Sequence, residues 1–332
     1  MNTLTRTVIP ASLLSSPPNL SSRFLEPIGL RWGRFPAADG ATLRWAHLSA
    51  PDPRMQCVLL GGFSEFIEKY FETMRDLAAR GLSVWCLDWR GQGGSERDAD
   101  FPTRPLARDF DRDAADVTAF IKAMIQPGPL PRVLVAHSMG GAIALLTLHA
   151  DPALVDVAVL SAPMLAVQTG PIPAVAAQAL ARSATAMGFG KNYIPGAGPW
   201  TFNTQLTATT SLTSHDPERC LVQRSWFEAR ARLRVDGLTY GWLDRAFALS
   251  ARFNTPGFLE GITTPLLIGS AGREFFVNPK QHRKALMRFP DCALAAFPDA
   301  KHELFMEADT YRDPWLAAID AFLAARAPTA RP

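Results

Sequence analysis

Residues 132–150, RVLVAHSMGGAIALLTLHA, place a serine where a nucleophile is expected. The first part is a short apolar and β-branched run typical of a buried strand, and the second spaces apolar residues as a helix does. Ser138 lies at the turn between them, with Ala136 two residues before it and Gly140 two residues after it. Such a nucleophile elbow strains the serine backbone and needs small flanking residues. We predict that Ser138 is a nucleophile; an incidental serine in a glycine-softened turn is the alternative.

A serine hydroxyl is a weak nucleophile and needs a base that is itself oriented by a carboxylate. After an elbow the chain order is serine, acid, histidine. Only His302, on the loop FPDAKHELF, follows the last predicted strand. His282 lies in a helical pattern and His215 in an inserted segment, where exposed histidines are expected, and an elbow would point His137 away from Ser138. We predict that His302 is the base, chosen from His47, His137, His149, His215, His282 and His302.

The orienting acid is expected on the loop after the strand PLLIGSA, which reads GREFFVNPKQ. Glu274 is the only carboxylate of that loop, and glutamate serves as the acid in some enzymes of this kind. We predict that Glu274 orients His302. An exposed Glu274, with the acid supplied from elsewhere, stays open as the alternative.

Acyl transfer also requires two N–H donors directed at the developing oxyanion. One is the backbone N–H of Met139, directly after the predicted nucleophile. The other is expected from the loop GGFSEF after an earlier strand, where Gly61 and Gly62 allow close backbone approach and Phe63 supplies its N–H. A simple glycine turn at Gly61 and Gly62 is the alternative.

The elements that must position these residues alternate along the chain. GLRWGRF and TLRWAHL form a predicted hairpin, and the strands QCVLLGG, LSVWCLD, RVLVAHS, VDVAVLS, PLLIGSA and CALAAFP follow. Helical patterns cover residues 68–80, 106–125, 140–149, 279–289 and 310–326. Alternating strands and helices predict an α/β fold with a doubly wound, mostly parallel sheet of eight strands.

This alternation divides the chain into three predicted parts: an N-terminal arm, a core made of two ranges, and an insertion between them. Residues 1–25 are rich in Ser, Pro and Leu and predict an irregular N-terminal arm. Residues 26–163 and 263–328 form the predicted core, and residues 164–262 show helical patterns with no clear strand. We call residues 164–262 the cap, because an insertion inside an alternating sheet lies where substrates enter.

The second half of the cap interleaves arginines with aromatic residues. Such a surface suits a lipid monomer or the face of an anionic membrane, because arginine binds phosphate in a bidentate way. The alternative is that the arginines pair with Asp216, Glu218, Glu228, Asp236 and Asp244 while the aromatics pack on the core. The arginines are Arg219, Arg224, Arg230, Arg232, Arg234, Arg245 and Arg252, among Trp226, Phe227, Tyr240, Trp242 and Phe247.

The composition of the chain bears on which ligands and partners can be expected. The 332 residues include 34 Lys plus Arg and 31 Asp plus Glu, so a net charge of +3 gives no reason to expect nucleic acid. Four scattered cysteines predict neither a metal cluster nor a disulfide framework. The run DWRGQGGSE has Glu96 where a dinucleotide fingerprint needs glycine, so no cofactor is expected. We predict a cytoplasmic protein, with peripheral membrane contact left open.

Several of these segments resemble a known family. AHSMGG, LDWRGQGGS, LSAPML and FPDAKHE are similar to the lysophospholipase and monoacylglycerol-lipase group of α/β-hydrolases, over about residues 27–326. The cap segments LTSHDPERC and RVDGLTYGWLDRA resemble those of the bacterial lysophospholipase L2 type. The resemblance implies the α/β-hydrolase fold, Ser138 as nucleophile, His302 as base, and Phe63 with Met139 as oxyanion donors.

The chain departs from that group at three places. Gly61-Gly62 stands where the monoglyceride-lipase loop begins His-Gly, Ala136 replaces the first glycine of the elbow, and Glu274 falls where the usual acid is Asp. The hypothesis we favour is a serine hydrolase that cleaves single-chain lipid esters, lysophospholipids or monoacylglycerols, through an acyl-enzyme. The alternatives are a catalytically weak protein that binds an acyl ligand, and a peptidase or general esterase.

Overall fold

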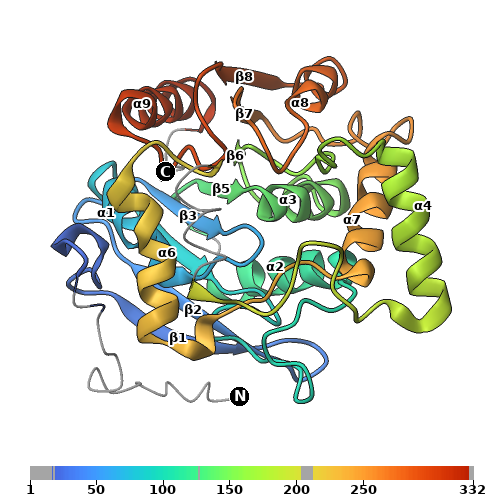
Figure 1. Cartoon of the computed structure of the whole chain (residues 1–332). Coiled ribbons are helices and arrows are strands. Elements are labelled where there is room, and N and C mark those ends of the chain that lie inside the picture. The colour runs from blue at the N-terminus through green and yellow to red at the C-terminus, as the bar shows by residue number, and fades with distance from the viewer. Residues whose placement is uncertain (1–16, 18, 126–127, 203–211, 329–332) are drawn as a thin grey trace.

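A single sheet of eight strands forms the centre of the computed structural model, which describes residues 17, 19–125, 128–202 and 212–328. The strands lie in the order β1-β2-β4-β3-β5-β6-β7-β8 (Figure 1). β2 pairs antiparallel with both β1 and β4, whereas all other neighbours are parallel. The prediction of an eight-stranded, mostly parallel sheet is confirmed.

The strands follow the apolar runs of the sequence. Along β5, Val133 and Val135 pack into the hydrophobic cluster on one face, while Leu134 and Ala136 pack into the cluster on the other. Burial of both faces explains why this strand is apolar throughout. The strands are β1 (Arg31–Pro36), β2 (Thr42–Leu48), β3 (Met55–Leu60), β4 (Leu82–Leu87), β5 (Arg132–His137), β6 (Val157–Ser161), β7 (Leu266–Ala271) and β8 (Cys292–Phe297).

Helices cover both faces of the sheet. α1 (Phe71–Ala79) and α9 (Asp309–Arg326) lie on one face, and their residues Met74 and Trp315 are buried in one cluster with Val135. α2 (Phe110–Met124), α3 (Met139–Ala150) and α8 (Pro279–Leu286) lie on the other face (Figure 1). The sheet is therefore doubly wound, as predicted.

Some element boundaries differ from the predicted ones. α2 begins at Phe110 and not at 106, because the carboxylate of Asp109 accepts a hydrogen bond from the Arg112 N–H and caps the helix there. The predicted helix 68–80 is divided into a 3-10 turn, Ile67–Tyr70, and α1. Most of the predicted arm, residues 1–16 and 18, lies outside the described residues, but Ser22–Phe24 form a 3-10 turn that buries Phe24.

Between β6 and β7 the described residues form helices and short turns. The helices are α4 (Ala174–Ala184), α6 (Pro217–Ala229) and α7 (Tyr240–Phe253), with a π-helical turn at Thr185–Phe189 and a 3-10 turn at Ala231–Leu233. α4 and α7 lie side by side at one end of the molecule, and α6 lies at the other (Figure 1). Residues 203–211 of the cap lie outside the described residues, and the cap boundaries at 164 and 262 stay a prediction.

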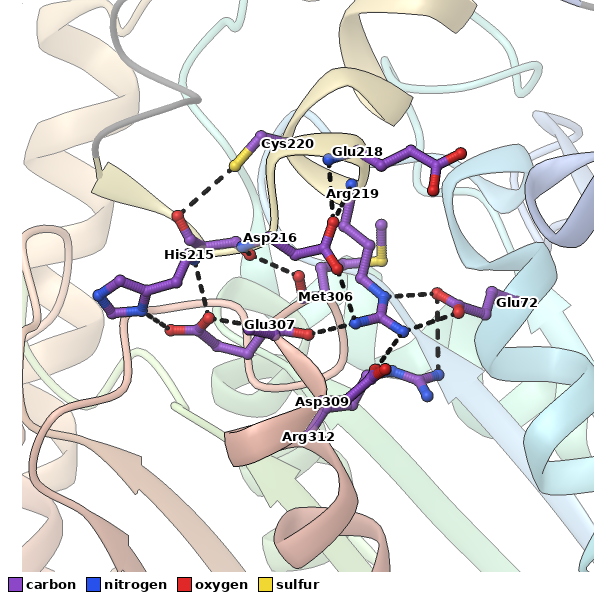
Figure 2. A network of polar contacts seen from close by, with 12 residues as sticks. Glu72, His215, Asp216, Glu218, Arg219, Cys220, Met306, Glu307, Asp309 and Arg312 are labelled. Atoms are coloured by element: carbon purple, nitrogen blue, oxygen red, sulfur yellow. Dashed lines mark hydrogen bonds and ion pairs between the residues drawn. The ribbon is translucent and has the colours of Figure 1, made fainter. Parts of the chain in front are cut away.

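Two buried arginines attach α6 and its C-terminal end to the core. Arg219 donates to both oxygens of Glu72 on α1 at 2.8 and 2.9 Å and to the carbonyl of Glu307 at 2.6 Å (Figure 2). It also pairs with Asp309 at the start of α9, at 2.7 Å. Arg230 pairs with the fully buried Glu68 at 2.9 Å. Through these contacts the cap is held to elements that belong to the sheet domain.

Most of the cap arginines have partners inside the protein. Arg224 pairs with Glu228 and Arg252 with Asp111, while Arg234 donates to the carbonyl of Phe227. Only Arg232 and Arg245 of the seven are exposed without an ion pair in the described part of the chain. This outcome favours the alternative in which the arginines make structural contacts. Binding to an anionic membrane stays a prediction.

We expect Arg219→Ala to lower the free energy of unfolding by about 3–5 kcal/mol. The buried carboxylate of Glu72 then loses both hydrogen bonds from Arg219 and keeps only the longer ion pairs with Arg23, at 3.5 Å, and Arg312, at 4.0 Å. Arg252→Ala is the matched control in the same cap. Its half-exposed pair with Asp111 should contribute only about 0–1 kcal/mol. Urea unfolding of the two variants measures the difference, and equal losses would contradict a structural role for the Arg219 contacts.

Candidate active site

Ser138 occupies a strained turn between β5 and α3. Its φ of 51° and ψ of −117° lie outside the regions that non-glycine residues ordinarily adopt. The turn is held by hydrogen bonds from the Ser138 N–H to the carbonyl of Ser161 and from Met164 N–H to the carbonyl of Ser138. A Cβ on Gly140 would come within 2.5 Å of the Gly61 carbonyl oxygen. Helix α3 can therefore approach the end of β3 only because position 140 is glycine.

The structure brings Ser138, His302 and Glu274 together. His302 Nε2 lies 2.9 Å from Ser138 Oγ, and His302 Nδ1 lies 2.7 Å from Glu274 Oε2. The other oxygen of Glu274 accepts backbone N–H groups of Phe275 and Phe276, both at 3.0 Å. With the Nδ1 proton donated to Glu274, Nε2 is left to accept the serine proton. The exposed Glu274 considered as an alternative is not observed, since its side chain is fully buried.

The two predicted oxyanion donors belong to residues near Ser138, since Met139 follows it in the chain and Phe63 lines the same cavity. Neither the Phe63 nor the Met139 backbone N–H has a hydrogen-bond partner among residues 17, 19–125, 128–202 and 212–328. The neighbouring Gly62 N–H donates to the Glu65 carboxylate and is thus occupied. Trp89 Nε1 donates to the Gly61 carbonyl at 2.7 Å, so both polar groups of the Gly61–Gly62 peptide, directly before the one that bears the Phe63 N–H, are hydrogen-bonded.

Comparison with known proteins gives the family of this arrangement. Residues 51–309 match the family model Hydrolase_4, described as serine aminopeptidase, S33. The chain belongs to this Hydrolase_4 family. The match covers both β5 with its elbow and the loop that carries His302.

Individual relatives of this Hydrolase_4 member are lipid hydrolases by name. This chain is 29% identical over 300 residues to lysophospholipase L2 of Escherichia coli, and the alignment covers 87% of this chain and 86% of that one. It is 25% identical over 261 residues to a monoacylglycerol lipase of Mycolicibacterium smegmatis, covering 78% and 84%. The fold matches monoglyceride lipase of Saccharomyces cerevisiae with a TM-score of 0.73 at 16% identity, covering 95% of this chain and all of that one.

The contact between His302 and Glu274 shifts the pKa values of the two groups in opposite directions. Burial by itself would lower the pKa of His302, but the Glu274 carboxylate outweighs it and raises that pKa above its ordinary value. Burial would raise the pKa of Glu274, yet the imidazole and the backbone N–H groups of Phe276 and Val277 lower it overall. Glu274 is therefore ionised at neutral pH, and its charge favours the protonated form of His302.

Two further histidines, His282 and His137, are buried near the site but bind other partners. His282 is fully buried, with Nδ1 2.9 Å from Ser270 Oγ and Nε2 2.8 Å from the Pro163 carbonyl, so the expectation of an exposed side chain is wrong. The helical pattern predicted the helix that carries His282, but it did not show that His282 lies on the buried face of that helix. His137 Nδ1 lies 3.1 Å from the Ser161 carbonyl, and burial lowers the pKa of His137 to about 3. Within the described residues, neither ring forms a hydrogen bond with Ser138 Oγ.

A cavity of about 410 Å³ opens onto Ser138 and His302. Part of its wall is apolar and reaches from core to cap, through Phe63, Met164, Val167, Leu238, Trp242 and Phe276. Another part is polar and includes Glu65, Gln223 and Glu303. Such a cavity can hold an acyl chain against the apolar wall and a polar group near the base.

Sequence analysis missed a buried charged cluster beside the site. Lys69 donates to Glu65 at 2.7 Å, to Glu303 at 2.8 Å and to Gln223 of α6 at 3.0 Å. Glu65 also accepts from Tyr70 and from the Gly62 N–H of the predicted oxyanion loop. Two signals in the sequence could have indicated it: Glu65 and Lys69 are four residues apart in the segment between β3 and α1, and Glu303 follows His302.

We expect the acid limb of the kcat/KM profile to have its midpoint above about 6.5, because Glu274 raises the pKa of His302, which must be neutral to act as base. In Glu274→Gln the carboxylate is lost, so the midpoint should move to lower pH and kcat should fall by roughly 10³–10⁴-fold. Asp299→Asn, at an exposed ion pair with Arg273, is the control and should change neither. A fully active Glu274→Gln would place the orienting acid elsewhere.

Proposed function

We propose that this Hydrolase_4 member is a serine hydrolase that cleaves single-chain lipid esters, lysophospholipids or monoacylglycerols, through an acyl-enzyme. The observation that carries the proposal is the contact of His302 with both Ser138 Oγ, at 2.9 Å, and Glu274, at 2.7 Å. This contact lies at a cavity with one apolar and one polar wall. The geometry supports the type of reaction, and the cavity supports the substrate class.

Each proposed role follows from position. Ser138 Oγ attacks the ester carbonyl carbon while His302 Nε2 takes the hydroxyl proton, and Glu274 stabilises the resulting imidazolium. The Phe63 and Met139 N–H groups donate to the oxyanion of the tetrahedral intermediate. His302 then returns the proton to the leaving alcohol, and the acyl group stays on Ser138. In the second half-reaction His302 activates a water molecule that releases the fatty acid.

The names of the relatives support a lipid substrate. The Escherichia coli relative is a lysophospholipase, and the Mycolicibacterium smegmatis relative is a monoacylglycerol lipase. The apolar wall of Met164, Val167 and Trp242 fits an acyl chain better than the polar side chains of a general peptide. The described helices are all too short or too polar to cross a bilayer.

We expect Ser138→Ala to retain less than about one hundredth of wild-type turnover, because the attacking atom is lost. The fold should be intact, since alanine leaves the elbow hydrogen bonds of the backbone in place. A fluorophosphonate probe should label the wild type once, at Ser138, and leave the variant unlabelled in an intact-mass measurement.

A substrate panel separates the proposal from its alternatives. Lysophospholipids, monoacylglycerols and p-nitrophenyl esters are compared with an aminoacyl p-nitroanilide. Hydrolysis of lipid esters alone supports the proposal, and preferential cleavage of the anilide would indicate a peptidase. A wild type that binds the probe lipids without hydrolysing any ester or labelling Ser138 would indicate a catalytically weak binding protein.

A further inference from the structure

The polar wall of the cavity contains Glu303, the neighbour of His302, which the leaving alcohol must approach in the proposed reaction. That alcohol receives its proton from His302, so its oxygen has to come within hydrogen-bond reach of Nε2. Glu303 follows His302 directly in the chain and lines the same cavity. Ser64, Glu65, Thr213 and Gln223 complete the polar wall. A group bonded to the leaving oxygen therefore lies in the cavity that these side chains line.

The charged groups that line the wall are carboxylates. Within the described ranges no arginine or lysine lines the cavity, whereas Glu65 and Glu303 both do. Lys69 lies behind them with only 2% of its side chain exposed, and its three donors are used by Glu65, Glu303 and Gln223. The ammonium group is thus unable to bind a ligand without giving up a partner.

The two carboxylate oxygens of Glu303 differ in their hydrogen bonds. Its Oε1 accepts from Lys69 at 2.8 Å, and its Oε2 has no hydrogen-bond partner in the part of the chain that the structure describes. In Glu65, by contrast, Oε1 accepts from Lys69, and Oε2 accepts from the Gly62 N–H and from Tyr70. Glu303 is therefore the acceptor of this cluster that a hydroxyl group of the substrate can reach.

We propose that Glu303 determines the leaving group, accepting a hydroxyl of an uncharged polyol such as glycerol and rejecting a leaving group that carries a phosphate. A phosphate placed against this wall would bring its negative charge to a desolvated carboxylate, and no cation on the wall would compensate for it. This inference rests on the proposed function and selects, within it, monoacylglycerols over lysophospholipids.

The test compares esters that share one acyl group and differ in the leaving group. Values of kcat/KM are measured for monoacylglycerol, lysophosphatidic acid, lysophosphatidylcholine and the p-nitrophenyl ester, all with the same acyl group and in the same neutral detergent micelles. We expect wild type to prefer monoacylglycerol over each phosphate-bearing lipid by at least about 100-fold, as like-charge contacts at desolvated sites are strongly unfavourable. Equal or better cleavage of either phosphate-bearing lipid overturns the inference.

The variant Glu303→Gln keeps the shape of the side chain and removes its charge. We expect its preference for monoacylglycerol over lysophosphatidic acid, given as the ratio of the two kcat/KM values, to fall by at least about tenfold. Glu260→Gln is the control, because it makes the same change in net charge at an exposed pair with Arg288 and does not line the cavity. An unchanged preference in a folded Glu303→Gln overturns the inference.

The outcomes also separate this inference from the proposed function. If wild type cleaves the p-nitrophenyl ester and treats all headgroups alike, the esterase assignment stands and the role of Glu303 is wrong. If wild type cleaves none of the four esters, the proposed function itself fails. Should Glu303→Gln prove unfolded by its thermal melting curve, the wild-type preference alone decides.

Discussion

The backbone at Ser138 is the constraint on which the site depends. A serine at φ 51° persists only because its surroundings fix it, and those surroundings include the other parts of the proposed active site. A Cβ on Gly62 would lie 3.1 Å from Ser138 Cβ, and one on Gly140 would lie 2.5 Å from the Gly61 carbonyl. The close approach of β3, β5 and α3 thus positions the proposed nucleophile and the segments that carry both proposed N–H donors.

Buried charges extend this constraint from the core into the cap. Glu65 accepts from both the Gly62 N–H and Lys69. Lys69 also donates to Glu303, next to His302, and to Gln223 on α6. Buried ion pairs contribute little net stability, but removing one partner is costly because the other is left desolvated. The cluster therefore specifies how the predicted oxyanion loop, the base loop and the cap lie relative to one another.

The sequence predicted what local pattern and chain order determine. The elbow is a local strand, turn and helix, and the positions of Glu274 and His302 follow from the loops that end two later strands. Contacts between distant segments have no such pattern. Arg219 and Glu72 are 147 residues apart, and nothing at either position distinguishes a buried ion pair from two exposed charges. His282 was misjudged for the same reason, since its partners Ser270 and Pro163 come from other elements.

The measurement that tests this account most directly is the mass of the chain during turnover. The protein is mixed with a saturating long-chain p-nitrophenyl ester, quenched with acid at successive times and digested. The account predicts a peptide that carries one acyl group on Ser138, appearing before the fatty acid reaches its steady rate of release. Fatty acid released while the Ser138 peptide stays unmodified at every quench time, or an acyl group on another residue, would contradict it.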